Sequence, residues 1–474
     1  MRHTFLAALL LCTAFGAGAQ TYSFKFRLDG IEDSMLYIGS HFRDETTLAD
    51  SARRSSDGSY TFKGSRKWNR GIYAIVRQDR TKQIGDFAID ESRKFTIIAD
   101  AKLSPASVTV NGCLSNQQMF NYMATVQEAR KEADKIRERM KNPDTKAQAE
   151  QEEKALVERM DRYDATIRHP KKPMVFFDLV NACENADVPD SVENKAYYYR
   201  AHYWDKLFGT DGRKLRAEGY ALLNSPQLFN KMNYFFFNII YHADSDTICK
   251  EIDQLMARMD GDTALQRYVL DFITPKYFRS TKNIGWDAVW CHIASQYYLA
   301  GKCPWATEGT LHNMCYNYNR IKQSLIGAHG QELWMLDTTQ TDAPEHWISS
   351  HRFPEKYVIL WFWDPDCHHC QEQSAQLKVL YDSLLTAPDR RFEVYAIGYE
   401  SDVAKWVKYV RDHEFHFVNV GGPNVNIDYQ EAYNVHGAPT MIILNEKRDI
   451  IMNKVLPVKQ ILPFLDNYEK NGHH

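Results

Sequence analysis

The sequence predicts an α/β domain at the C-terminus, preceded by a small antiparallel β-rich domain and a mostly α-helical domain. Short strand-like runs separated by turn signals fill the chain up to residue 112. Apolar residues at helical spacing dominate 113–328, and strands alternate with helices from 329 to 474. A chain of 474 residues is also too long for one domain with a single core, because single domains rarely grow beyond about 250 to 300 residues.

The composition indicates a folded protein with no strong electrostatic field. Hydrophobic residues make up 44% of the chain and charged residues 25%, as in ordinary globular domains. Lys and Arg total 58 against 61 Asp and Glu, which gives a net charge of -3. Neither nucleic acid nor an anionic membrane is favoured as a partner.

The first residues, 1–19, have the pattern of a cleavable export signal. Arg2 and His3 precede an apolar run over 5–15, and small residues end at Ala19 before Gln20. The run is about eleven residues, shorter than the roughly twenty that span a bilayer. We expect an exported protein in the periplasm or cell envelope, without a membrane span.

Residues 20–112 alternate β-rich runs with turn residues, among them Asp57-Gly58, a hairpin signal. The pattern predicts strands at 22–28, 35–38, 59–62, 71–76, 94–98 and 107–110.

From near Leu114 the apolar residues recur at helical spacing, and Asn142-Pro143 interrupts this pattern. The sequence therefore predicts a hairpin of two charged amphipathic helices. We expect its charged outer face to be solvated surface. Further on, Cys291, Cys303 and Cys315 show no metal-ligand spacing, so we expect buried thiols or one structural disulfide.

The last third of the chain predicts an α/β layer structure with an inner parallel pair of strands. The expected strands are 357–363, 391–397, 416–420, 440–444 and 450–455, and the expected helices are 367–385, 402–413, 427–434 and 458–469.

One motif in this region carries recognisable chemistry. Cys367-His368-His369-Cys370 follows a hydrophobic strand and opens a helix, where unpaired N–H groups and the helix dipole stabilise a thiolate. Cys367 is the expected nucleophile. Cys370, one turn further on, is expected to resolve a mixed disulfide formed at Cys367.

This segment resembles the thioredoxin superfamily, and in particular the TlpA/ResA-like exported thiol-disulfide oxidoreductases. Besides the cysteine pair, the resemblance rests on the tryptophan-rich run before Cys367 and on 435–440, Val-His-Gly-Ala-Pro-Thr. The order of the three domains is similar to multidomain oxidoreductases of Bacteroidetes-type bacteria.

The resemblance implies roles for further residues. Pro439 would form the cis peptide bond that packs beside the cysteine pair, and Ala438 would present its backbone to a substrate strand. Glu400 is the best match to an acidic residue that shuttles the proton of the resolving cysteine, although it could equally be a surface carboxylate. No organic cofactor is implied, because the Cys367–Cys370 pair itself gives up and takes up the two electrons, as a dithiol or a disulfide.

The direction of electron flow is left open by the motif. His368 and His369 replace the Gly-Pro of reducing thioredoxins, and cationic residues there favour the reduced form and thus an oxidant or isomerase. Many TlpA/ResA-like proteins are instead reductants fed by a membrane electron donor. Asp366, in a place where many relatives have tryptophan, would oppose a thiolate at Cys367.

The motif is also compatible with other functions. The cysteines and histidines of the motif, with His436, are metal-ligand types, so copper delivery is one alternative, although adjacent helical residues point in different directions. A partner-binding protein with a structural disulfide is another, and a peroxidase is a third. We expect protein thiols or disulfides as substrates and a periplasmic or membrane electron partner. The oligomeric state, the substrate and the role of the first two domains are not predicted.

Overall fold

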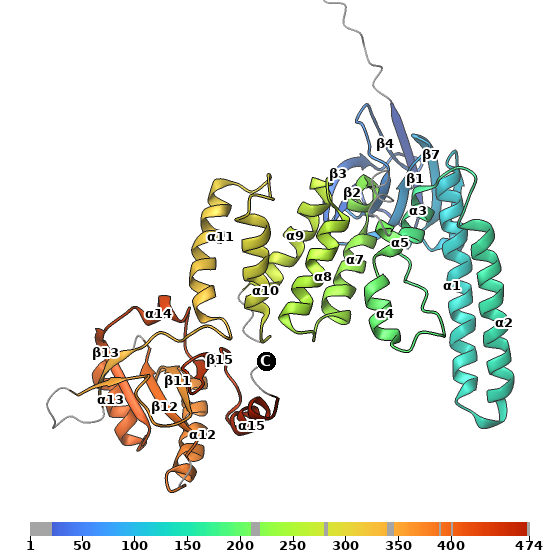
Figure 1. Ribbon diagram of the computed structural model, residues 1–474. Helices are drawn as coiled ribbons and strands as arrows, with labels where there is room; N and C mark the ends of the chain where they lie inside the picture. Colours follow the sequence, from blue (N-terminus) through green and yellow to red (C-terminus); the bar gives the residue numbers. More distant parts are fainter. Residues whose placement is uncertain are drawn as a thin grey trace, which may run out of the picture. The chain divides into compact units, whose positions relative to one another are not determined.

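The computed structural model describes residues 21–209, 219–278, 283–338, 346–387, 390–399 and 402–471. The chain divides into two compact units, Met1–His242 with Leu255–Leu265 and Ala243–Gln254 with Gln266–His474. Strands dominate the start of the first unit, helices fill the middle of the chain, and a second β-sheet region ends the second unit (Figure 1). This order of structure confirms the predicted fold class.

Two four-stranded sheets form the β-rich region, in the orders β4-β1-β7-β8 and β3-β2-β5-β6. Neighbouring strands are antiparallel, except that β1 and β7 are parallel, which the sequence pattern did not predict. The strands are β1 (Tyr22–Asp29), β2 (Met35–Phe42), β3 (Glu45–Arg53), β4 (Tyr60–Gly64), β5 (Gly71–Val76), β6 (Gln83–Ile89), β7 (Lys94–Asp100) and β8 (Thr109–Asn111), with the short helix η1 (Pro105–Ser107) before β8.

Aromatic side chains of the two sheets pack against each other. Every second residue of β1 is buried, and Phe24 stacks on Phe95 of the same sheet with ring centroids 4.7 Å apart. Phe26 meets Phe87 of the other sheet edge to face at 5.1 Å. The strands β3 and β6 were not predicted, because β3 is largely polar and exposed and Gly85 interrupts the apolar pattern of β6.

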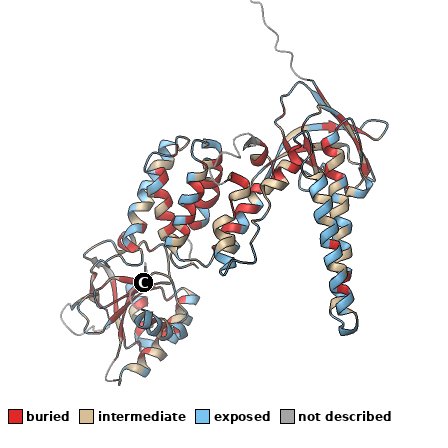
Figure 2. Cartoon of the chain, turned by 45° about the vertical axis from the view of Figure 1, so that its right-hand side comes forward, coloured by how far each residue is buried: buried red, intermediate tan, exposed pale blue. Residues whose placement is uncertain are grey.

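The predicted helical hairpin is present as α1 (Leu114–Met140) and α2 (Pro143–Ile167). Asn142 is the N-cap residue of α2, and its side chain accepts a hydrogen bond from the Asp144 N–H at 3.0 Å. Towards the tip, the two helices bury only a thin cluster of Ile136, Ala149 and Leu156. Most of their surface is exposed or half-buried, as expected for a solvated face (Figure 2).

The helical region continues with shorter elements. These are α3 (Val175–Ala182), α4 (Lys195–His202), α5 (Asp205–Phe208), α6 (Gly219–Leu223), α7 (Pro226–Tyr234), the π-helical η2 (Phe235–Ile239), α8 (Ser245–Arg258), α9 (Thr263–Tyr277), α10 (Trp286–Ile293), the π-helical η3 (Ala294–Tyr298), α11 (Glu308–Ile321) and η4 (Lys322–Ser324). No helix in the described ranges is long and apolar enough to cross a membrane.

The C-terminal region is a seven-stranded mixed sheet in the order β10-β9-β13-β12-β11-β14-β15. The strands β11, β12 and β13 are mutually parallel, and the other pairings are antiparallel. The elements are β9 (Trp334–Asp337), β10 (Trp347–Ser349), β11 (Tyr357–Trp363), α12 (His368–Leu384), β12 (Phe392–Gly398), α13 (Val403–Asp412), β13 (Val418–Val425), α14 (Tyr429–Ala432), β14 (Thr440–Leu444), β15 (Ile450–Met452), η5 (Val458–Gln460) and α15 (Ile461–Asn471).

Strand β11 is an inner strand of this sheet, between β12 and β14, and every one of its residues is buried. One face packs against side chains of α12, α13 and α15, and the opposite face packs against α14 and β9. The predicted α/β alternation is therefore confirmed. The strands β9 and β10 were not predicted, because each contributes only a few residues at one edge of the sheet.

Replacing Trp361 tests the role of β11. Trp361 is fully buried, and its indole N–H donates to the Ser374 hydroxyl on α12 at 2.8 Å. We expect Trp361→Ala to destabilise the C-terminal region by about 3 to 5 kcal/mol, because it opens a large cavity. Ser374→Ala should cost only about 1 to 3 kcal/mol, by leaving the indole N–H unpaired. Urea unfolding followed by circular dichroism measures both, and equal costs would contradict this packing account.

Candidate redox site

Cys367 is the N-cap residue of α12. Its sulfur accepts a hydrogen bond from the backbone N–H of Cys370 at 3.3 Å. The thiol also lies 3.8 Å from the carbonyl oxygen of Ala438, to which it can donate. Because an N–H group at a helix N-terminus stabilises negative charge on a sulfur, this geometry suits a nucleophilic cysteine.

The segment between β11 and α12 is a tight turn that fixes Cys367 in this place. The Asp364 carboxylate accepts a hydrogen bond from the Asp366 N–H at 2.7 Å, and the Asp364 carbonyl accepts one from the Cys367 N–H at 3.1 Å. The Gln371 side chain donates to the Pro365 carbonyl at 2.6 Å. The end of the buried strand and the first turn of the helix are thus joined at the cysteine.

Cys370 differs from Cys367 in exposure and in acidity. Its side chain is buried, with a relative exposure of 0%. Burial raises the pKa of the Cys370 thiol to about 12, the hydrogen bond with Cys367 adds to the rise, and a hydrogen bond from the Asp364 backbone opposes it. Cys370 therefore keeps its proton at neutral pH, as suits a thiol that reacts second.

The two histidines of the motif point outward. Their side chains are 79% and 82% exposed, and both approach the Glu372 carboxylate, His368 at 3.2 Å and His369 at 3.7 Å. Glu372 is one turn further along α12, so the pattern of i+3 and i+4 contacts brings it to both rings. Both imidazole rings therefore lie on the exposed surface of the first turn of α12.

Asp366, which the sequence suggested as an opposing charge beside Cys367, has a cationic partner. Its carboxylate forms an exposed ion pair with Lys405 of α13, and this hydrogen bond raises the pKa of Lys405. The ammonium group offsets the negative charge of Asp366. Lys405 received no role from the sequence, because it lies 39 residues further along the chain.

The structure brings the Ala438–Pro439 segment to the cysteine pair. The Ala438–Pro439 peptide bond is cis, as the resemblance implied. The Thr440 hydroxyl donates to the Gly437 carbonyl at 2.7 Å, which ties the residues on either side of this bond together. Cys367, Cys370 and Ala438 thus form one site, with the histidines at its rim.

The structure describes one carboxylate near Cys370, that of Asp364. The predicted shuttle, Glu400, lies outside the described residues. Asp364 is close enough for its charge to raise the pKa of Cys370. The sequence placed Asp364 in the run before the motif without assigning it a role, and only its two-residue spacing to Asp366 hinted at the turn.

The other six cysteines that the structure describes are free thiols. Burial raises the pKa of Cys291 and of Cys303 to about 12, as expected for inert core thiols. Cys315 is exposed. Within the described ranges, no three His, Cys, Asp or Glu side chains gather closely enough to hold a metal ion.

Comparison with known protein families agrees with the fold of the C-terminal region. Residues 355–450 match the family model for thioredoxin-like domains. This stretch runs from just before β11 to the start of β15, so it contains the cysteine pair and the cis-proline segment. The C-terminal region is a thioredoxin-like domain. No curated protein matches the chain.

Similar solved structures include proteins from Bacteroides and Cytophaga. A thioredoxin-like protein from Bacteroides caccae aligns at 17% identity over 60% of this chain and 98% of its own, with a TM-score of 0.45. A domain of a possible thiol-disulfide isomerase from Cytophaga hutchinsonii aligns at 30% identity over 31% of this chain and 95% of its own, with a TM-score of 0.26. A thiol:disulfide interchange protein from Bacteroides aligns at 18% identity over 32% of this chain and 93% of its own, with a TM-score of 0.26. The assignment above rests on the family match.

Alkylation tests the asymmetry of the two thiols. We expect iodoacetamide to modify Cys367 in the reduced native protein at neutral pH and to leave Cys370 unmodified, because Cys370 is buried and protonated. Mass spectrometry of the peptides measures both sites, and denaturant should make both reactive. Equal labelling in the native protein would contradict the asymmetry.

Proposed function

We propose that this chain is an exported thiol-disulfide oxidoreductase that exchanges disulfides with protein substrates through Cys367 and Cys370. The observation that carries the proposal is the N-cap position of Cys367, whose sulfur accepts the Cys370 N–H at 3.3 Å. A structural disulfide needs no such stabilisation of a thiolate. The export signal predicted at residues 1–19 supports a periplasmic or envelope location.

In the reducing direction, the Cys367 thiolate attacks one sulfur of a substrate disulfide. The substrate S–S bond breaks, a mixed disulfide forms at Cys367, and the second substrate sulfur leaves as a thiolate. Cys370 then loses its proton and attacks the Cys367 sulfur. The mixed disulfide breaks, the Cys367–Cys370 disulfide forms, and the first substrate sulfur leaves.

Two electrons pass from the cysteine pair to the substrate in this sequence, and the two departing thiolates take up two protons. The reverse sequence oxidises a substrate dithiol. The direction depends on the reduction potential of the pair and on the electron partner that restores it. No organic cofactor is required by this scheme, because the sulfur atoms themselves carry the electrons.

Surrounding residues assist these steps in distinct ways. Ala438 offers its carbonyl beside the Cys367 sulfur, where it can align the backbone of a substrate strand, and Pro439 shapes that segment. Asp364, and Glu400 as the sequence predicted, are the carboxylates that would accept the Cys370 proton. His368 and His369 favour the reduced state through positive charge when protonated.

Trapping the mixed disulfide tests the order of attack. Cys370→Ser should accumulate a covalent adduct with insulin or another disulfide-bonded protein at Cys367, because the resolving thiol is missing. Cys367→Ser should form no adduct at Cys370, which is buried. Non-reducing electrophoresis and mass spectrometry detect the adduct. Trapping at Cys370 instead would contradict the assigned roles.

Exchanging the histidines tests their effect on the pair. Changing His368→Gly and His369→Pro together should lower the reduction potential by roughly tens of millivolts, because it removes groups that stabilise the thiolate form. The control is His413→Asn, an exposed histidine at the C-terminal end of α13, which should leave the potential unchanged. Equilibration with glutathione buffers measures the potential, and an unchanged or higher value in the double variant would refute this role.

A further inference from the structure

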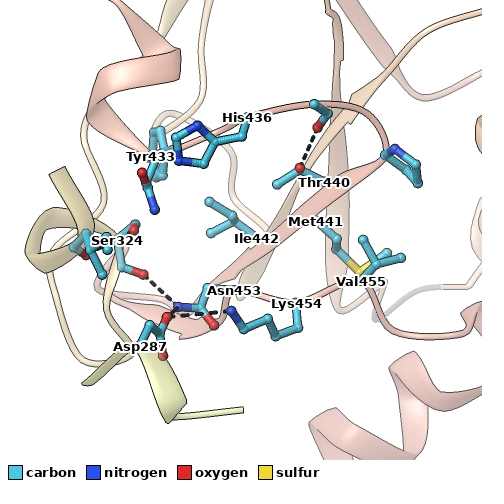
Figure 3. A pocket seen from close by; sticks show the side chains of 14 residues that line it. Asp287, Ser324, Tyr433, His436, Thr440, Met441, Ile442, Asn453, Lys454 and Val455 are labelled. Carbon is cyan, nitrogen blue, oxygen red and sulfur yellow. Dashed lines mark hydrogen bonds and ion pairs between the residues drawn. The ribbon is translucent and has the colours of Figure 1, made fainter. Parts of the chain in front are cut away.

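A cavity of about 380 Å³ lies beside the cis-proline segment within the second unit. Its size is in the range of ligand sites in proteins. In the thioredoxin-like domain, its walls come from the loop from Tyr433 to Pro439, the start of β14, and the residues that follow β15 (Figure 3). The helical region adds Asp287, Ile321 and Ser324.

The cavity is a gap in the β14–β15 hairpin. These strands are antiparallel and pair Ile443 with Met452. Residue numbers rise on one strand as they fall on the other, so a longer hairpin would place Asn453, Lys454 and Val455 opposite the first residues of β14. The pairs would be Ile442 with Asn453, Met441 with Lys454, and Thr440 with Val455. All of these residues line the cavity instead.

The helical region holds this gap open. The Asn453 side-chain N–H₂ group donates to the Asp287 carboxylate at 2.5 Å and to the Ser324 carbonyl at 2.9 Å. Lys454 approaches the same carboxylate at 3.8 Å. Figure 3 shows Asn453 and Lys454 gathered beside Asp287, across the cavity from His436 and Tyr433. The residues that follow β15 therefore turn away from β14, at the point where they could have extended the pairing of the two strands.

As a result, the first residues of β14 have a free edge. Thr440, Met441 and Ile442 pair with β11 on one side. On the other side, no strand of the described residues pairs with them. A free edge beside a pocket is what an added peptide strand requires, because main-chain hydrogen bonds supply affinity and side-chain pockets supply selectivity.

The free edge of β14 also begins close to Cys367. Gly437 and Pro439 line the cavity, and the residue between them, Ala438, has its carbonyl 3.8 Å from the Cys367 sulfur. Strand residues advance about 3.3 Å each. A peptide joined to Cys367 would reach the cavity within a few residues.

We propose that this cavity binds an extended, uncharged segment of the substrate polypeptide, which adds as a short strand to the free edge at Thr440–Ile442. The inference rests on the proposed function, because it takes the occupant to be the substrate. Apolar side chains are preferred, since Ile321, Met441, Ile442 and Val455 line the cavity and the Asp287–Lys454 pair balances its charge. Asp287 and Ser324 are positioning residues that give the helical region a part in substrate selection.

Binding of a cysteine-free peptide tests this site independently of thiol exchange. The probe is a fluorescein-labelled peptide of about nine alternating valine and serine residues, added to the full mature chain. Fluorescence anisotropy should show saturable binding. Val455→Trp fills the cavity from a partly exposed position and should weaken binding at least about tenfold. The matched control, Val379→Trp on the exposed face of α12, should bind as the unmodified chain does.

Hydrogen exchange locates the bound peptide. Saturating peptide should slow amide exchange in the fragment that contains 437–445. Absence of saturable binding, equal affinity in the two tryptophan variants, or protection confined to other fragments would each overturn the proposal. Peptide binding without any disulfide exchange would contradict the proposed function and leave the binding site standing.

Discussion

The hydrogen bond from the Cys370 N–H to the Cys367 sulfur depends on where β11 ends. This strand is buried along its whole length between β12 and β14, so its end cannot shift without disturbing the core on both faces of the sheet. The turn at Asp364 then places Cys367 at the first turn of α12. One cysteine is thereby presented at the helix terminus and the other is buried beneath it, which is the asymmetry that two-step disulfide exchange requires.

Local sequence patterns predicted much of this architecture. β11 and β14 were expected at the bounds observed, and the cysteine pair was expected at a strand-to-helix junction, because apolar runs and turn residues are local signals. The short strands β9 and β10, and the polar edge strand β3, are set by tertiary pairing and gave little signal. The three-domain boundaries at 112 and 328 stay predictions.

The site was predictable only where residues are close in sequence or matched by family resemblance. Cys367, Cys370 and the cis bond at Pro439 fall in that class. The partner of Asp366 and the wall of the cavity do not, since Lys405 and Asp287 meet the site only through the fold. The contact between Asp287 and Asn453 links the helical region to the thioredoxin-like domain. The two residues are far apart in the sequence, so no local pattern could have predicted this contact.

The reduction potential of the pair tests the central claim most directly. The full mature chain would be equilibrated with glutathione buffers, and the Cys367–Cys370 disulfide quantified by mass spectrometry of the trapped peptides. A reversible redox pair should titrate at a potential between about -270 and -120 mV, the span from thioredoxin to DsbA. A disulfide that never forms would contradict an exchanging pair. A disulfide whose reduction potential lies below about -300 mV would also contradict it and would indicate a structural role.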